Sequence, residues 1–391
     1  LHVPKTEAYK LQDLHSATKQ VVDNFTFRKF DTSLILPWSV DHAINGDDET
    51  PSIAMDKSVG SSLSALFHFQ KKKDAVMIDS TIGEKNHYVL KSEVSEILRD
   101  WIAKLDINET PPWVMKSGVK PDELTKTKKI KENRSRGLTT PDFLHLVLSR
   151  VFFGSLMANV KQGRVYNGSA IGLVNSSTEI VEVVAHLVDT RYHVDAKMME
   201  EMTDQKFPDL NELRSKLRII AGDWSSQESY CSVPFLFVLW QELEKVYKIQ
   251  YHLARKQNVE VRCEFYGLRT FSEAEYERDA AVRWQLLYSA TVHPLACGSR
   301  LLTFTCGLMT GTYLTALLQT FHSVIHINMA VHDLLKGTPY HKWSILKDAC
   351  KICDLNDDYL LSLHPHLRKY VTLEKITKYL GNLGMIHTHG L

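Results

Sequence analysis

The sequence predicts a mainly α-helical protein with two helical lobes, a central basic cleft and an extended N-terminal arm. Three observations predict this fold class: helix-capping patterns recur along most of the chain, residues 1–60 lack helical periodicity, and basic residues concentrate in one segment. A chain of 391 residues favours two lobes, because single hydrophobic cores stop growing near roughly 250–300 residues. The predicted domains are the arm at 1–60, an N-terminal lobe at 61–225 and a C-terminal lobe at 226–391.

The composition is that of a folded protein without an extreme charge. The chain is 44% hydrophobic and 24% charged, with 47 Lys and Arg against 46 Asp and Glu. This balance excludes a disordered chain, a histone-like polycation and a strongly acidic chaperone. It does not exclude a nucleic-acid binder, because binding depends on where the basic residues cluster.

Cysteine content and hydropathy indicate a reducing compartment and no membrane contact. Six cysteines in so long a chain are too few for a disulfide scaffold. The stretch Leu301–His332 carries no Asp, Glu, Lys or Arg, but many Thr, His and other polar residues interrupt it. We therefore expect a buried core segment there, not a membrane span.

The N-terminal arm carries one apolar, proline-bounded segment. Leu34, Ile35, Leu36 and Trp38 surround Pro37, ahead of an acidic turn. We expect these four residues to dock on a neighbouring subunit and to form a homo-oligomer. A terminal strand that packs on its own lobe is the alternative.

Several elements have local signals. Residues 75–78 and 88–90 predict a hairpin, and Ser92 begins an amphipathic helix. The triplet Thr140-Pro141-Asp142 predicts a helix to about Met157.

The second half of the chain has similar signals. Pro234 begins a long helix, and Ser272–Glu275 has the spacing of a capping box. The leucines of 355–363 suggest a helix with a packed face. A seam between lobes is expected near Gly222 to Ser232, and a last amphipathic segment begins at Val371.

The motifs of common enzymes are missing from the sequence. We find no Gly-rich phosphate loop, dinucleotide fingerprint, nucleophile elbow or His-Glu-x-x-His helix. The acid pairs Asp47-Asp48 and Asp357-Asp358 lack the second acidic cluster that a two-metal site requires, so solvated surface is the favoured interpretation. The sequence therefore predicts no enzyme, no resident metal and no cofactor.

One cysteine pair leaves a metal site open. Cys350 and Cys353 are followed by His364 and His366, and these four side chains could hold zinc. Two buried thiols are the favoured alternative.

The most unusual feature is a basic segment between Lys116 and Arg136, in which Lys and Arg far outnumber acidic residues. Such a segment could neutralise several phosphates of a nucleic acid, whereas a solvated loop or a nuclear-import signal is the alternative. Tyr166 or Tyr230 could stack on bases in a groove for single-stranded RNA. The predicted RNA-binding residues are Lys126, Lys128, Lys129, Lys131, Arg134, Arg136, Arg150, Lys161, Arg164, Arg214, Arg218, Arg283 and Arg300.

This layout resembles the nucleoproteins of negative-strand RNA viruses, especially the non-segmented group. The segment from Val233 through Val292 resembles the start of their second lobe, with a long helix before Phe265–Arg269 and Trp284–Tyr288. The resemblance implies a protein that coats single-stranded RNA without sequence specificity and assembles into a nucleocapsid. It also implies a location in the virion and in the host cell interior, cytoplasm or nucleus.

Two other function classes remain open. A helical enzyme could use buried His or Cys residues with a metal or haem. A host adaptor could bind an acidic partner through the basic loop.

Overall fold

The computed structural model describes a chain that forms two compact units, each built from segments distant in sequence. The described residues are 11–26, 34–47, 50–82, 85–119, 137–164, 167–173, 182–183, 186–187, 219–225, 227–304 and 307–389. Unit 1 comprises Leu1–Asp31, Asn159–Tyr230 and Ala316–Leu391, and unit 2 comprises Thr32–Ala158 and Cys231–Thr315. The division into 1–60, 61–225 and 226–391 remains a prediction.

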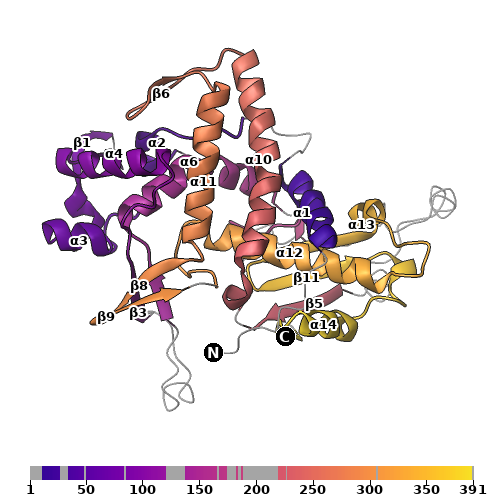
Figure 1. The fold of residues 1–391 in the computed structure, drawn as a ribbon. Helices are drawn as coiled ribbons and strands as arrows, with labels where there is room; N and C mark the ends of the chain where they lie inside the picture. The colour runs from indigo at the N-terminus through magenta and orange to yellow at the C-terminus, as the bar shows by residue number, and fades with distance from the viewer. Residues whose placement is uncertain are drawn as a thin grey trace. The chain divides into compact units, whose positions relative to one another are not determined.

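Unit 1 is built around a four-stranded antiparallel sheet in the order β10-β11-β5-β12 (Figure 1). Its strands are β5 (Ile219–Trp224), β10 (Cys350–Leu355), β11 (Asp358–Leu363) and β12 (His387–His389). Its helices are α1 (Leu11–Thr26), α12 (Thr315–Leu334), α13 (Trp343–Ala349) and α14 (Leu373–Asn382), with short 3-10 turns η3 (Gln227–Tyr230) and η4 (Pro365–Leu367).

The core of unit 1 contains α12, whose side chains are all buried from Thr320 to His332, including Phe321 and Ile325. A helix that is buried around its circumference belongs in a core even though it carries polar side chains, and this helix accounts for the second part of the uncharged stretch at 301–332.

Unit 2 combines helices with three small sheets. The helices are α2 (Val40–Asn45), α3 (Ser61–Phe67), α4 (Ser92–Asp106), α6 (Phe143–Gln162, in this unit to Ala158), α10 (Val233–Lys256) and α11 (Glu273–Ser289), with the 3-10 turn η1 (Lys72–Ala75). Two of the sheets are hairpins: β1 (Val76–Ile82) with β2 (Lys85–Leu90), and β6 (Val261–Cys263) with β7 (Gly267–Arg269). The third sheet has the strand order β4-β3-β8-β9, with β4 (Gly137–Thr140), β3 (Met115–Val119), β8 (His293–Cys297) and β9 (Arg300–Phe304).

Local capping signals were reliable predictors of the helices. Ser232 caps α10, with a proline in its first turn, and Ser272 with Glu275 forms the predicted capping box of α11. Thr372 caps α14, and Asp142 accepts a hydrogen bond from the backbone N–H of Leu144 at the start of α6. These signals succeed because they act within one helical turn. The β1–β2 hairpin is also confirmed.

The mainly α-helical fold class is wrong. The described residues contain twelve strands, β1 to β12, in four sheets. The leucines of 355–363 belong to the β10–β11 hairpin, not to a helix, and the expected seam begins in strand β5. Strands that are buried by tertiary packing carry apolar runs that periodicity alone cannot distinguish from helices.

The apolar arm segment packs on its own unit. Ile35 and Leu36 are buried, and the backbone N–H of Trp38 donates to the carbonyl of Val151 at 2.8 Å. The Trp38 ring occupies the space that a side chain at Gly154 would fill. The prediction that Leu34, Ile35, Leu36 and Trp38 dock on a neighbouring subunit is therefore corrected: Ile35 and Leu36 belong to the core of unit 2, and Leu34 and Trp38 are half-buried beside it.

Among the described residues, one helix is long and apolar enough to cross a membrane by length and composition, α6, and most of it is buried within the protein.

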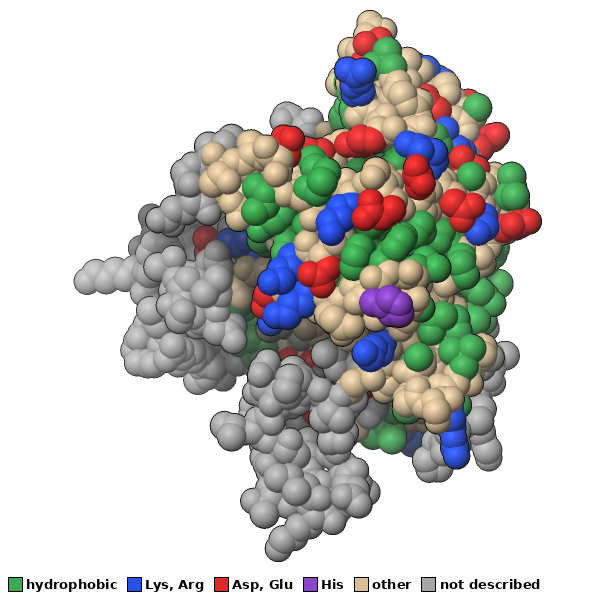
Figure 2. All heavy atoms as spheres, turned by 90° about the vertical axis from the view of Figure 1, so that its left-hand side faces the viewer, with side chains coloured by type: hydrophobic (Ala, Val, Ile, Leu, Met, Phe, Trp, Pro, Cys, Tyr) green, Lys and Arg blue, Asp and Glu red, His purple; other side chains and the backbone are tan. Residues whose placement is uncertain are grey.

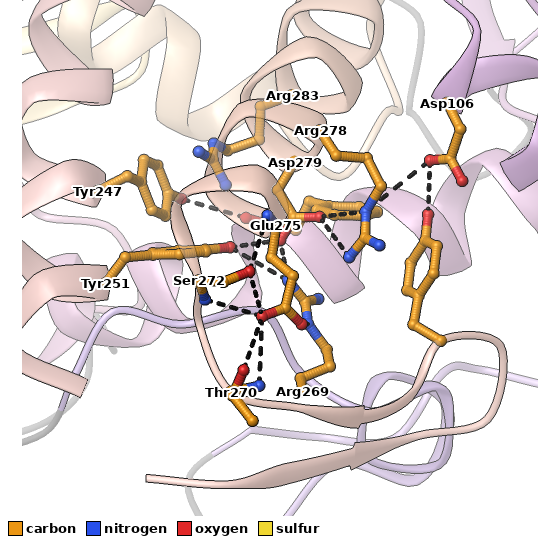
Figure 3. Close-up of polar contacts among 12 residues, drawn as sticks. Asp106, Tyr247, Tyr251, Arg269, Thr270, Ser272, Glu275, Arg278, Asp279 and Arg283 are labelled. Carbon is orange, nitrogen blue, oxygen red and sulfur yellow. Dashed lines mark hydrogen bonds and ion pairs between the residues drawn. The ribbon is translucent and has the colours of Figure 1, made fainter. Parts of the chain in front are cut away.

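A buried ion pair joins α10 to α11 in unit 2, and Figure 3 labels Arg283, the partner on α11. Arg283 is fully buried, and its Nε and Nη2 donate to the two carboxylate oxygens of Glu244 at 2.6 and 2.5 Å. Burial alone would lower the pKa of Arg283, but the carboxylate more than reverses this effect and raises the pKa. The Tyr247 ring covers the guanidinium, with 3.9 Å between the ring centroid and Cζ.

A second buried ion pair lies beside the first. Arg269 and Tyr251 both donate to Asp279, which has no exposed surface (Figure 3). Glu275 accepts from the backbone and the hydroxyl of Ser272. Each buried charge in this network has an opposite charge beside it, so removal of one partner would leave an uncompensated buried charge, and the paired charges are not free for a ligand.

We predict that breaking the Arg283–Glu244 pair strongly destabilises the protein. Glu244→Ala leaves a buried, uncompensated guanidinium, and the free energy of unfolding should fall by about 3–5 kcal/mol. The combined replacement Arg283→Met with Glu244→Leu should cost less than Glu244→Ala alone. Denaturant unfolding measures both effects. Lys248→Ala, which removes an exposed pair with Glu273, is the control and should leave the stability nearly unchanged.

Asp142 is a buried carboxyl at the start of α6. It accepts hydrogen bonds from the backbone N–H groups of Ser62 and Leu144 at 2.9 and 3.1 Å. Burial raises its pKa from 3.8 to about 6, against the opposing effect of these hydrogen bonds. Between these two pH values the folded protein binds more protons than the unfolded chain, so stability falls as the pH rises.

We predict that Asp142→Asn removes a pH dependence from folding. From pH 4 to pH 7 the wild-type protein should lose about 2 kcal/mol relative to this variant, because the ionised carboxylate is buried. Urea unfolding of both proteins at the two pH values measures the difference. Asp56→Asn, at an exposed carboxylate, is the control and should show little relative change. An equal stability difference at both pH values would contradict this account.

Candidate active site

Two acidic side chains meet on one face of the sheet in unit 1. Asp223 on β5 and Asp358 on β11 are directly paired in the antiparallel register. Directly opposed residues of an antiparallel pair point to the same face, so the two carboxylates are neighbours. Asp223 is half-buried and Asp358 is exposed, so the end of this face that carries the acids is accessible to a ligand, although Cys353 and Ser362 on the same face are buried.

A third acid, Asp357, occupies the turn of the β10–β11 hairpin. Its carbonyl accepts a hydrogen bond from the backbone N–H of Trp224 at 2.9 Å, which ties the turn to β5. Asn356 precedes it with φ of 63°, in the left-handed region that Asn tolerates better than most residues. Burial raises the pKa of Asp358, and the negative charges of Asp357 and Asp223 raise it further. The three acids therefore share one electrostatic environment.

No described Lys or Arg forms an ion pair with Asp223, Asp357 or Asp358. The hydroxyl of Thr388 on β12 donates to Asp223 Oδ2 at 3.2 Å, and Thr388 is the register partner of Asp223. In the described part of the chain, no three His, Cys, Asp or Glu side chains form a complete group of metal ligands. The acids thus concentrate negative charge at a place where the ion pairs of the described residues do not neutralise it.

The opposite face of the same strands is buried. Trp224 Nε1 donates to the Ser323 hydroxyl of α12 at 2.9 Å, and the Trp224 ring meets the rings of His322 and His326 edge-on. Asp354 on β10 also points to this side and has no exposed surface, and burial raises its pKa well above the usual range. Asp354 is therefore separate from the three acids on the accessible face.

The sequence analysis missed this site for two reasons. It placed Asp357-Asp358 on solvated surface because no second acidic cluster was evident. The missing partner is Asp223, which lies 135 positions before Asp358 in the chain. It meets Asp357 and Asp358 only through the β11–β5 register. An available signal was the pattern of a short apolar run, Asn-Asp-Asp, and a second apolar run, which is typical of a hairpin.

Many of the predicted RNA-binding residues lie outside the described residues: Lys126, Lys128, Lys129, Lys131, Arg134, Arg136, Arg214 and Arg218. Tyr166 also lies outside them. Lys116 is on β3 and is exposed.

The remaining predicted contacts do not form one group. In unit 2, Arg150 is buried and donates to the carbonyl of Pro51 at 2.8 Å, and Arg300 is exposed on β9. Arg283 has no exposed surface, so its predicted contact with RNA is wrong. In unit 1, Lys161 and Arg164 are half-buried at the end of α6.

Surface charges on one face of the molecule are mixed. Figure 2 shows Lys and Arg side chains interspersed with Asp and Glu among the described residues of that face, with hydrophobic side chains between them. This face therefore offers no continuous basic area within the part that is described. Tyr230, the other tyrosine expected to stack, accepts a hydrogen bond at its hydroxyl from the backbone of Ile386 at 3.0 Å.

Cys350 and Cys353 are both buried on β10, with Cys350 opposite Leu363 and Cys353 opposite Leu360. Positions three apart on a strand point to opposite faces, so the two sulfurs do not converge on one ion. Burial raises the pKa of each thiol to about 12, which keeps both protonated. These features favour two buried thiols over a zinc site with His364 and His366.

Comparison with known proteins shows which solved structure has a similar fold. No family model and no curated protein matches the chain. Among solved structures, the chain is similar to the Sicinivirus 3Dpol RNA dependent RNA polymerase, with a TM-score of 0.67 and 16% identity. The match covers 99% of this chain and 64% of that chain, so this chain spans 64% of the length of the structure it matches.

This similarity overturns the nucleoprotein resemblance. The two-lobed helical nucleoprotein fold is wrong, because the whole chain follows the fold of a polymerase structure that contains sheets as well as helices. The expectation of a nucleocapsid protein without enzymatic activity is corrected with it, since the solved structure that shares the fold is an enzyme.

Proposed function

We propose that this chain carries the catalytic acids of an RNA polymerase that joins ribonucleotides on an RNA template. The observation that carries the proposal is the pairing of Asp223 with Asp358, beside Asp357, on the accessible face of the unit 1 sheet. The similarity of fold to an RNA dependent RNA polymerase supports it independently. The polymerase substrates and the activity are proposals, because a likeness at 16% identity concerns the fold.

The donor set fits magnesium ions. Mg²⁺ prefers oxygen ligands, and in polymerase sites it is held by one or two carboxylates together with substrate phosphates and water. Asp223, Asp357 and Asp358 supply such carboxylates, two of them from directly paired strands. When bound, two metal ions would stabilise the charge on the attacking and leaving oxygens of phosphoryl transfer.

The chain's own residues have distinct roles in this proposal. Asp223 and Asp358 present their carboxylates on one face, and the Thr388 hydroxyl orients the carboxylate of Asp223 through its hydrogen bond. The Asn356-Asp357 turn is held against β5 by the bond between Trp224 N–H and the Asp357 carbonyl. β-strands position Asp223 and Asp358, which favours a fixed geometry for this pair, whereas Asp357 lies in the hairpin turn.

Single-stranded RNA as a partner also belongs to this proposal. A polymerase must hold a polyanionic strand and triphosphates, and basic side chains supply that contact. The segment with Lys126, Lys128, Lys129, Lys131, Arg134 and Arg136 suits this role and remains a prediction, as does a location inside the host cell.

We predict that removing either paired carboxylate abolishes nucleotide transfer. Asp223→Asn and Asp358→Asn keep the side-chain shape but remove the negative charge, and incorporation should fall about 100-fold or more. The assay measures incorporation of labelled ribonucleotides on a primed RNA template by the intact protein. Asp333→Asn, which removes an exposed ion pair with Lys336 in the same unit, is the control and should keep its activity. A wild-type protein that never incorporates nucleotides would refute the proposed function.

We predict that the activity depends on a divalent cation held by these acids. Chelation with EDTA should abolish incorporation, and added Mg²⁺ should restore it. Asp358→Asn should raise the Mg²⁺ concentration needed for half of its own maximal activity, because one ligand has lost its charge. Incorporation that persists at full rate in EDTA would exclude the metal assignment.

A further inference from the structure

On the face of the unit 1 sheet opposite to Asp223 and Asp358, one tyrosine side chain crosses the strand β5. Tyr359 on β11 is the register partner of Gly222 on β5, so its side chain lies on the buried face, opposite to Asp358. Tyr359 is 2% exposed. A Cβ added at Gly222 would overlap the Tyr359 ring, which shows that the ring lies directly over this glycine.

The phenol hydroxyl reaches the strand on the far side of β5. It shares a hydrogen bond of 2.9 Å with Nε2 of His387 on β12, although β5 separates β11 from β12 in the sheet. Only a residue without a side chain at position 222 leaves room for this contact. Glycine at 222 and tyrosine at 359 are therefore matched in size.

His387 is fixed from two further sides. Its Nδ1 shares a hydrogen bond of 2.9 Å with the Thr377 hydroxyl of α14, and its ring meets the Trp224 ring edge-on, with 5.4 Å between centroids. His387 is 4% exposed. The contact thus connects β11, β5, β12 and α14 within one unit.

Each residue of this contact is a chain neighbour of a residue on the accessible face. Asp358 precedes Tyr359, Asp223 follows Gly222, and Thr388 follows His387. Because strand side chains alternate between faces, a shift of the buried residues moves the acids as well. The buried contact therefore controls how the acids face one another.

We propose that Tyr359 and His387, meeting across Gly222, are positioning residues that hold Asp223 and Asp358 in the register needed for nucleotide transfer. This inference rests on the proposed function. Small displacements of reacting groups reduce rates steeply, about 100-fold for roughly 1 Å, so a contact that fixes three strands has a kinetic effect.

The first test removes only the hydroxyl that joins the strands. In Tyr359→Phe the ring still covers Gly222, but the hydrogen bond between the phenol hydroxyl and Nε2 of His387 is lost. We expect kcat for nucleotide incorporation to fall about tenfold and the Mg²⁺ concentration for half-maximal activity to rise. The KM for the RNA template should stay within about twofold. Tyr340→Phe, at a half-buried tyrosine of unit 1 outside the sheet, is the control and should match the wild type.

The second test exploits the size match. Gly222→Ala should inactivate the protein, because the added methyl group overlaps the Tyr359 ring. Combining it with Tyr359→Val removes the ring, and the double variant should recover the activity of Tyr359→Val alone. A double variant that stays as inactive as Gly222→Ala would count against the matched contact.

The outcomes separate this inference from the proposed function. If the wild type incorporates nucleotides and folded Tyr359→Phe has an unchanged kcat and Mg²⁺ dependence, the positioning role is wrong and the polymerase function stands. A lower melting temperature with unchanged kcat would likewise mean that the contact only stabilises the fold. If the wild type itself incorporates nothing, the proposed function has failed.

Discussion

The position of β5 between β11 and β12 is the constraint on which the candidate site depends. Asp223 has no acidic neighbour in its own segment, and it meets Asp358 only because the two strands pair in one antiparallel register. A shift by a single residue would turn Asp223 to the buried face and bring Gly222 or Trp224 to the accessible one. The chemistry of the site is therefore a consequence of strand pairing more than of any local motif.

The features that the sequence predicted correctly are those decided within a few residues. The helix starts predicted near Pro234 and Val371, the capping box at Ser272 and the β1–β2 hairpin depend on hydrogen bonds between near neighbours. The candidate site could not be found in this way. Its acids come from strands far apart in the chain, and the apolar residues of 350–363 suit a buried strand as well as a helix.

The apolar arm segment shows that interaction partners, like the acids of the site, cannot be read from local sequence. Ile35 and Trp38 have the apolar, non-helical pattern of an extension that docks elsewhere, yet they pack on their own unit. The apolar composition of a segment indicates that it is buried, but it does not indicate whether the segment packs on a neighbouring subunit or on its own unit. For that reason an exposed oligomer contact and an internal core segment have the same appearance in the sequence.

The two units use charge in opposite ways, and this contrast identifies the site. Arg283 is buried in unit 2 and is matched by Glu244, so removing either partner costs stability without exposing a binding group. Asp223 and Asp358 stand together without a cation among the described residues, so their mutual repulsion is a cost that the fold alone does not offset. A cation bound between them would remove that cost. An arrangement that is unfavourable for the isolated protein is thus expected where a ligand completes the structure.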